Sequence, residues 1–228
     1  MAVSRTVMLS LRGLLVLLFI WFRMSLSTTS VAPSKALQFF NVVGKLKTLK
    51  RTGWVNHDIP LPESVADHMY RMSMLSFLIT DSAVDKDELI KICLLHDLAE
   101  AKVGDITPFD GVSKEDKRRL EETALRMILS NIGHEEVAVE LMALWLQYEE
   151  GTSVTSAVAR ELDKFEMIVQ ANEYEEAHPG TLLHSFFSST EGYFKHPEIL
   201  AWDAELRRAR GERLAAAAAA GDSAPADL

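Results

Sequence analysis

The chain has 228 residues, of which 48% are hydrophobic and 25% charged, and its formal net charge is −9 at pH 7. This is the composition of an ordinary globular protein, long enough to bury a sizeable core in one domain. The single cysteine, Cys93, excludes a disulfide framework within the chain and points to a reducing compartment. Because Cys93 lies in an apolar run, we expect it to pack rather than to act as a nucleophile.

The charges are distributed unevenly. Residues 1–57 contain eight Lys or Arg and no Asp or Glu, whereas residues 58–228 contain 16 basic and 33 acidic side chains. An acidic body is unsuited to a nucleic-acid polymer, because such binding neutralises phosphates with basic side chains. A basic N-terminal stretch beside acidic groups could still hold one small phosphate.

Residues 1–33 read as an addition to the fold. Arg5, Arg12 and Arg23 punctuate a stretch that is rich in Ser, Thr and small apolar residues, with an apolar core at residues 13–22. That core is about half as long as a spanning helix, so no stable membrane span is expected. The composition fits an organelle presequence, for a plastid or mitochondrion, or a weak anchor; a secretory signal and an untargeted extension are the alternatives. The lack of disulfides favours an intracellular protein, in such an organelle or in the cytoplasm.

Apolar residues recur every three or four positions after Ser34, which predicts a helix from this residue to about Gly53. Residues 51–54 are expected to follow as a loop. Two prolines at residues 60–62 keep the next stretch extended.

A second helix is predicted to begin at Ser64, because Asp67 follows it at the spacing of a capping box. His68 therefore falls in the first turn of that helix. A third helix is predicted to open at residues 85–87, where acidic residues precede an apolar run.

The third helix carries the most unusual stretch of the chain, in which polar and charged side chains interrupt an apolar run. On a continuous helix, His96 and Asp97 diverge by about 100° yet both can lean toward one point, and Glu100 lies one turn after His96. Gly104 provides a stop and leaves Asp105 in the turn just beyond. Three carboxylates and an imidazole this close repel or desolvate one another unless a positive charge lies among them. A divalent cation fits that need.

The remaining chain is also predicted to be helical, because no strand-like alternation of useful length and no repeat occur. The charged run 114–122 is expected to be a solvated face with i,i+4 ion pairs. The expected helices cover residues 113–132, 135–148, 152–176, 184–194 and 197–210, with a loop at 107–111 and a disordered, alanine-rich tail at 211–228. Together these elements predict one all-α domain over residues 34–210.

Four residues break otherwise apolar helical faces in a way that packing does not require: His68, His96, Asp97 and Asp163. A buried, unpaired carboxylate is costly, so Asp163 in particular needs a partner. Taken singly, each has an ordinary interpretation, as a core histidine or a surface ion pair. Together, two imidazoles and two carboxylates suit manganese, cobalt, iron or magnesium better than a structural zinc, which favours thiolates.

The order of these residues resembles the H…HD…D motif of the HD superfamily of metal-dependent phosphohydrolases. The match is closer to its 5′-deoxynucleotidase branch, the HD domain-containing protein 2 group, and spans about residues 35–205. The resembling segments are residues 49–55, 62–72, 96–108 and 161–164. The resemblance implies an HD-domain helical bundle with a metal site in its core. It also implies a metal-dependent enzyme that hydrolyses deoxyribonucleoside 5′-monophosphates to deoxynucleoside and phosphate, and a homodimer.

By that resemblance, His68, His96, Asp97 and Asp163 hold the divalent metal, with Glu100, Asp105 and the Ile106 backbone carbonyl as further contributors. Manganese, cobalt or magnesium is expected, with iron or zinc as alternatives. The metal lowers the pKa of a bound water and orients it for in-line attack on phosphorus. Glu100 or Asp105 would take that water's proton or return one to the leaving 5′ oxygen, and the sequence leaves both assignments open.

Two residues are expected to bind the substrate. A guanidinium fork suits a phosphate bidentately, which makes Arg51 the expected clamp, and an indole suits a sugar or base, which makes Trp54 the expected contact. A bacterial relative has Arg directly before this Trp, whereas here Gly53 precedes Trp54 and Arg51 lies three positions back. The loop must therefore have a different shape. The alternative role for Trp54 is hydrophobic anchoring of that loop.

Two other functions compete with this one. The first is an HD hydrolase that acts on a cyclic or polyphosphorylated nucleotide, but the sequence shows no additional basic cluster for such a substrate. The second is a catalytically silent HD scaffold that binds nucleotide or a partner. The presence of all four ligand residues and both acids argues against the silent scaffold. For a homodimer, the face at residues 141–145 could serve, or could equally be core.

Overall fold

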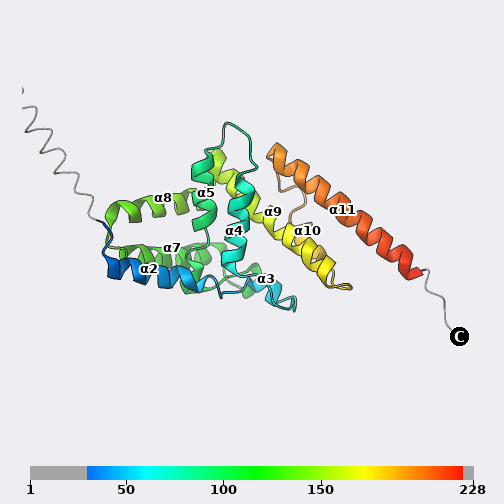
Figure 1. Cartoon of the computed structure of the whole chain (residues 1–228), viewed down its shortest axis with the longest axis horizontal. Helices are drawn as coiled ribbons and strands as arrows, with labels where there is room; N and C mark the ends of the chain where they lie inside the picture. Colours follow the sequence, from blue (N-terminus) through cyan, green and yellow to red (C-terminus); the bar gives the residue numbers. More distant parts are fainter. Residues whose placement is uncertain (1–29, 223–228) are drawn as a thin grey trace, which may run out of the picture.

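The computed structural model describes residues 30–222, so most of the N-terminal extension lies outside the described residues (Figure 1). The helices are, in chain order, α2 (Pro33–Lys45), α3 (Thr52–Val55), α4 (Val65–Ser76), α5 (Lys86–Leu95), α6 (Glu100–Val103), the 3₁₀ helix η1 (Pro108–Asp110), α7 (Lys114–Ser130), α8 (Glu135–Glu150), α9 (Val154–Ala177), α10 (His184–Ser189) and α11 (Pro197–Asp222). Within the described range, Lys50 and Ser64 form an isolated antiparallel β-bridge. The predicted all-α fold class is confirmed.

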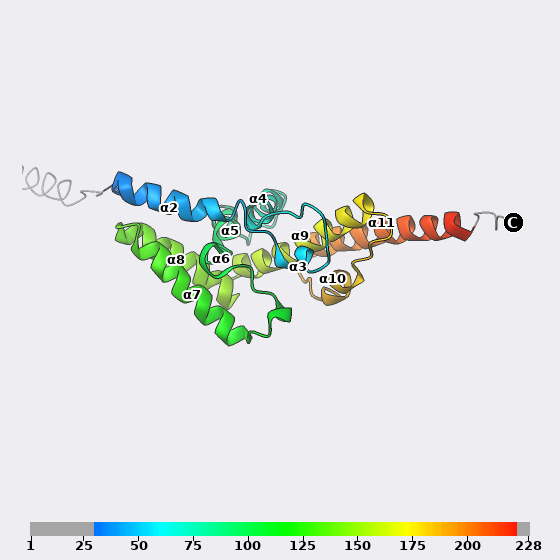
Figure 2. The same ribbon diagram turned by 90° about the horizontal axis from the view of Figure 1, so that it is seen from below.

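Helices α4, α5 and α9 form the centre of the molecule and pack against one another. Figure 2 shows α2, α7 and α8 toward one end and α10 and α11 toward the other, with α9 running between them. The side chains of Met72, Ile92 and Leu162, one from each central helix, are almost fully buried. Burial of this apolar surface is the main favourable term that holds the three helices together.

Helix α4 begins where the sequence predicts. The Ser64 hydroxyl accepts the Asp67 backbone N–H, and the Asp67 carboxylate accepts the Ser64 backbone N–H at 2.8 Å. This reciprocal capping box satisfies two backbone donors that a helix start leaves unpaired. It fixes the first turn of α4, and with it the position of His68.

The chain before α4 differs from the sequence prediction. The helix expected over residues 34–53 begins at Pro33 and already ends at Lys45. Proline suits the first helical position because its fixed φ is helical and its missing N–H costs nothing there. Beyond α2, Lys50 pairs with Ser64 in the isolated β-bridge, so the chain is extended at this point. The short helix α3 then forms where a loop was expected.

The polar stretch does not lie on one continuous helix, contrary to expectation. Helix α5 ends at Leu95 and α6 begins at Glu100. Between them, Leu98 N–H donates to Leu95 O and Glu100 N–H donates to Asp97 O, so these bonds span three residues instead of four. Such 3₁₀-type turns are tighter than an α-helix. His96 and Glu100 are therefore not one turn apart on a single helix, as was predicted, because a tight turn separates them.

Several element ends also differ from prediction. The expected loop at residues 107–111 contains η1, and the helix expected over residues 184–194 is shortened to α10. Helix α11 continues to Asp222, so the alanine stretch that was expected to be disordered is helical. Alanine has the highest helix propensity, and proline first appears at Pro225, beyond the end of α11.

None of the helices of residues 30–222 combines the length and apolar character that crossing a bilayer requires. The apolar core at residues 13–22 lies outside this range.

Candidate metal centre

Two buried imidazoles, those of His68 and His96, meet where the central helices converge. His68 comes from the first turn of α4 and His96 follows the end of α5, and their ring centroids are 5.4 Å apart. His68 Nε2 lies 3.3 Å from Asp163 Oδ1, and His96 Nε2 lies 3.1 Å from Asp97 Oδ2. Asp97 Oδ2 is also 3.9 Å from His68 Nε2. The structure thus brings the four predicted ligand residues together.

Each imidazole is oriented by its Nδ1 atom. His68 Nδ1 bonds to the Glu166 carboxylate, and His96 Nδ1 lies 3.0 Å from the Cys93 backbone oxygen. Because a carbonyl only accepts, His96 Nδ1 is the donor in this contact, and Nε2 is the ring nitrogen that faces the cluster. Both Nε2 atoms are buried and find no hydrogen-bond partner within residues 30–222. A cation between these nitrogens and the facing carboxylates would satisfy both, so the donor set fits a divalent metal.

Glu166 holds His68 from behind. It is fully buried on α9, one turn after Asp163, and also accepts a hydrogen bond of 2.8 Å from Arg71 Nε. Burial raises the pKa of Glu166, but the His68 and Arg71 charges outweigh it and lower that pKa. Glu166 was not predicted as a site residue. Its spacing from Asp163 was the available signal, because it put both acids on one helix face.

Asp163 is buried and fully engaged. Its Oδ2 atom accepts hydrogen bonds of 3.0 Å from both the Tyr148 hydroxyl and Lys164 Nζ, and its Oδ1 atom faces His68. Burial raises the pKa of Asp163, but Lys164 and His68 outweigh it and hold the pKa well below its usual range. The alternative interpretation, an ion pair with a basic neighbour, is thus met by Lys164, but at a buried carboxylate that also faces His68.

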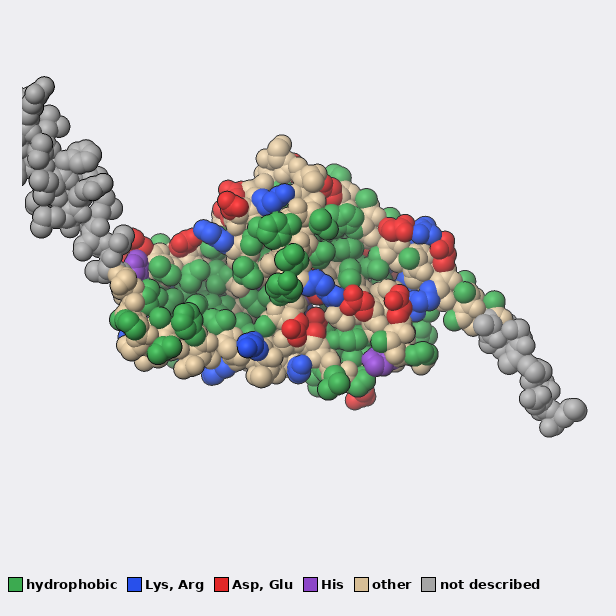
Figure 3. All heavy atoms as spheres, viewed as in Figure 1, with side chains coloured by type: hydrophobic (Ala, Val, Ile, Leu, Met, Phe, Trp, Pro, Cys, Tyr) green, Lys and Arg blue, Asp and Glu red, His purple; other side chains and the backbone are tan. Residues whose placement is uncertain are grey.

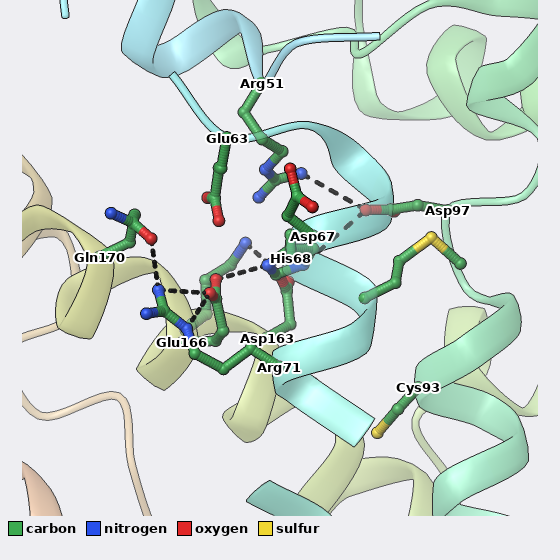
Figure 4. Close-up of polar contacts among 12 residues, drawn as sticks. Arg51, Glu63, Asp67, His68, Arg71, Cys93, Asp97, Asp163, Glu166 and Gln170 are labelled. Carbon is green, nitrogen blue, oxygen red and sulfur yellow. Dashed lines mark hydrogen bonds and ion pairs between the residues drawn. The ribbon is translucent and has the colours of Figure 1, made fainter. Parts of the chain in front are cut away.

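Arg51 reaches the opposite side of the cluster. Its Nη1 atom lies 3.3 Å from Asp97 Oδ2 (Figure 4) and 3.9 Å from Asp105 Oδ1. Burial raises the pKa of Asp97, but His96 and Arg51 lower it by more, so the pKa of Asp97 lies below its usual value. The guanidinium has more N–H donors than these two contacts use.

The two predicted catalytic acids differ in their surroundings. Asp105 Oδ2 accepts the Thr52 backbone N–H at 2.7 Å, and the Thr52 hydroxyl donates to the Asp105 backbone oxygen at 2.7 Å. Glu100 is 3% exposed, and its Oε2 atom has no hydrogen-bond partner in the described chain. Burial, together with Asp97 and Asp105, raises the pKa of Glu100 well above its usual value. Asp105 is thus fixed in place, whereas Glu100 has an oxygen available for proton exchange.

Trp54 and the Ile106 carbonyl have protein partners of their own. Trp54 is 2% exposed, its ring centroid lies 4.4 Å from that of Phe186, and its Nε1–H donates to Glu63 Oε1 at 2.8 Å. This buried position agrees with the alternative role of Trp54, hydrophobic anchoring of the loop. A contact between Trp54 and the substrate stays a prediction. The Ile106 carbonyl accepts a hydrogen bond of 2.8 Å from Lys117 Nζ, so its role as a metal ligand also stays a prediction.

Glu63 and Tyr148 also contact the site and were not predicted. The Glu63 carboxylate lies close to His68 and Glu166, within the spacing that could hold an ion. Burial and the Glu166 charge raise the pKa of Glu63 to about 7, although the Trp54 hydrogen bond opposes them. Glu63 directly precedes a predicted helix start, which was a weak signal. Tyr148 carried none, because an aromatic residue on a predicted helix usually packs.

Known proteins share both the sequence pattern and the fold. A family model for the HD domain matches residues 43–199. The 5′-deoxynucleotidase HDDC2 of Homo sapiens is 44% identical over 183 residues, covering 80% of this chain and 89% of that protein. Its namesake from Danio rerio is 47% identical over 182 residues, covering 79% and 90%. The solved structure of the HD domain-containing protein YGK1 of Saccharomyces cerevisiae superposes with a TM-score of 0.60 at 29% identity, covering 82% of this chain and 91% of that one.

Proposed function

The chain belongs to the HD-domain family, and we propose that its buried cluster is the metal centre of a 5′-deoxynucleotidase. The enzyme hydrolyses deoxyribonucleoside 5′-monophosphates to deoxynucleoside and phosphate, as the names of its relatives indicate. One observation supports the centre most strongly. The Nε2 atoms of His68 and His96 are buried, lack a partner among residues 30–222, and face the carboxylates of Asp97 and Asp163.

His68, His96, Asp97 and Asp163 are the proposed metal ligands. A mixed set of nitrogen and oxygen donors favours manganese, cobalt or magnesium, with iron or zinc as alternatives. When bound, a divalent cation would neutralise phosphate charge and lower the pKa of the attacking water. The Ile106 carbonyl keeps a second lone pair, which could add an oxygen ligand.

The protein's own groups divide the remaining work. Arg51 directs its unused N–H donors to the phosphate, which it can hold bidentately. Glu100 exchanges protons at Oε2, the oxygen that lacks a protein partner within residues 30–222. Its carboxylate takes the proton of the attacking water and returns it to the leaving 5′ oxygen, and the raised pKa of Glu100 favours this return. Asp105, held in place by Thr52, lies 3.9 Å from Arg51 Nη1 through its Oδ1 atom and keeps Arg51 aimed at the site. Trp54 anchors α3 and so fixes the backbone that carries Arg51.

Phosphate release from a panel of deoxy- and ribonucleoside 5′-monophosphates tests this function. The full chain is stripped of metal and assayed after addition of manganese, cobalt, magnesium, iron or zinc. Release that requires metal and favours the deoxy substrates is the expected result. Protein that binds metal but releases no phosphate from any member of the panel would contradict the proposal.

We also propose that the enzyme is a homodimer. Leu144 and Trp145 are buried in the core of the chain itself, which favours the core alternative for residues 141–145. In contrast, Tyr70, Phe77 and Leu78, on and just after α4, are 64%, 54% and 60% exposed, and hydrophobic side chains gather on the face seen in Figure 3. Light scattering should give twice the chain mass of 25.5 kDa. A mass of one chain, at micromolar concentration, would contradict the dimer.

The acid-free stretch at residues 1–33 supports a further proposal, organelle import. A fluorescent protein fused after the full chain should then enter a plastid or mitochondrion, whereas a fusion that lacks residues 1–33 should not. Secretion of the full-length fusion, or equal distribution of both fusions, would contradict import.

A further inference from the structure

Helix α7 turns one of its charged residues toward the candidate site. The run 114–122 was expected to be a solvated face, and its other members from residue 114 to residue 120 are exposed. Lys117 is instead half-buried, and its Nζ atom donates to the Ile106 carbonyl at 2.8 Å. The same ammonium lies 3.5 Å from Glu121 Oε1, one turn further along the helix.

The Lys117 contact completes a clamp around Asp105. Thr52, at the start of α3, holds the Asp105 carboxylate and its backbone oxygen. Lys117 holds the next carbonyl along the chain, that of Ile106, from the other side. The segment between Gly104, with a φ of 81°, and η1 is therefore tied to two separate helices.

The charge of Lys117 lies within the field of the site acids. Burial lowers the pKa of Lys117, but Glu121, Asp97 and Glu100 outweigh burial and raise it, so the ammonium keeps its proton. Glu121 is 8% exposed, and its orientation toward Lys117 keeps the ammonium on the inner face of α7. A lysine that served only to solubilise the surface would not need this partly buried position, because partial burial of its charge costs free energy.

On the basis of the proposed function, we propose that Lys117 is a positioning residue for the reaction. It fixes residues 104–107 through the Ile106 carbonyl, so that Asp105 stays in place opposite Arg51. Lys117 touches neither the ligand atoms of the imidazoles nor the proposed attacking water. It acts on the rate through Asp105.

The test compares Lys117→Met, which removes the charge and the donors at similar length, with Lys117→Arg, which keeps both. Lys114→Met, at an exposed position of the same helix, is the matched control. We expect Lys117→Met to lower kcat by about tenfold to a hundredfold, because small displacements of reacting groups have effects of this size. Metal content and Tm should equal those of the parent, Lys117→Arg should recover most of the rate, and Lys114→Met should match the parent.

A double-mutant cycle shows whether Lys117 acts through Asp105. In an Asp105→Ala background, Lys117→Met should change kcat by less than about twofold, because coupled residues are not additive. Equal losses in both backgrounds would overturn the inference. Parent kinetics in Lys117→Met would overturn it too, as would a loss that follows lost metal or a lowered Tm.

Amide hydrogen exchange separates this inference from the proposed function. Lys117→Met should exchange faster than the parent in the peptide that covers residues 104–107, with α4 and α9 unchanged. If the parent releases no phosphate from any nucleotide, the proposed function fails, and this measurement alone decides on Lys117. Unchanged exchange at residues 104–107 would then overturn the positioning role.

Discussion

The two walls of the metal centre are built in different ways. The helical wall consists of α4 and α9. His68 lies in the first turn of α4, and Asp163 and Glu166 lie one turn apart on α9. The turn wall consists of residues 96–105 and the start of α3, where short turns place the acids and the preceding Arg51. Regular helices supply fixed directions, whereas tight turns bring neighbouring side chains to one point.

The walls also differ in how fully their polar groups are engaged. On the helical wall, Asp163 has three partners and Glu166 bonds to both His68 and Arg71. On the turn wall, Glu100 Oε2 has no hydrogen-bond partner within the described chain. We infer that the helical wall holds its metal ligands, His68 and Asp163, rigidly, while the turn wall adds the ligands His96 and Asp97 and also carries the groups that handle substrate and proton. Substitutions in the two walls should therefore produce different kinetic signatures.

Removal of a metal ligand from the helical wall should have the largest effect. Asp163→Ala should lose bound metal after dialysis and lose turnover by about a thousandfold or more, because the cation provides several kcal/mol of charge stabilisation. Added manganese should raise the Tm of the parent by mass action but not that of the variant. Glu176→Ala, at an exposed position of α9, should behave as the parent. Full metal content in Asp163→Ala would contradict the role given to this wall.

Glu166→Gln should have the next largest effect, and on metal affinity. The amide keeps the size of the side chain but loses the charge that orients His68, and such outer partners typically change metal affinity by about 10–100-fold. A chelator competition titration measures this affinity. At saturating metal, kcat should return close to the parent value. A kcat that stays low at saturation would mean that the helical wall also takes part in the chemistry.

On the turn wall, Arg51→Met should act on substrate and not on metal. We expect KM for deoxynucleotide to rise by about tenfold with a smaller change in kcat, because a clamp used in ground and transition states gives uniform binding. Metal affinity should be unchanged or higher, since a positive charge next to Asp97 has been removed. Lys50→Met, at the exposed position that directly precedes Arg51, is the control. Weaker metal binding in Arg51→Met would erase the distinction between the walls.

Trp54→Phe should have the smallest effect. Phenylalanine keeps the packing against Phe186 but removes the hydrogen bond to Glu63, which should cost about 1 kcal/mol of stability and lower Tm by about 2–4 °C. If Trp54 only anchors α3, the ratio of activity on deoxy and ribo substrates should not change. A changed ratio would show that the indole contacts the sugar.

The sequence predicted the backbone of the helical wall better than that of the turn wall, although Glu166 on the helical wall was not predicted. His68 followed from the capping box at Ser64, and Asp163 from its place on an apolar helical face, because both signals are local. The tight turns at residues 96–99 depend on where α5 meets the other central helices, and no local pattern marks them. The contact of Lys117 with Ile106 and the short α3 likewise depend on tertiary packing.

The break between α5 and α6 sets a limit on how this protein can be stabilised by design. Continuing the α-helix through residues 96–99 would restore i→i+4 hydrogen bonds and suit good helix formers such as Leu98 and Ala99. It would also change the approach of Asp97 Oδ2 to His96 Nε2, which is 3.1 Å in the present geometry. Local stability and activity are therefore opposed over these four residues. Thermostabilising substitutions chosen by helix propensity should leave them untouched and be placed instead on the exposed faces of α7, α8 and α11.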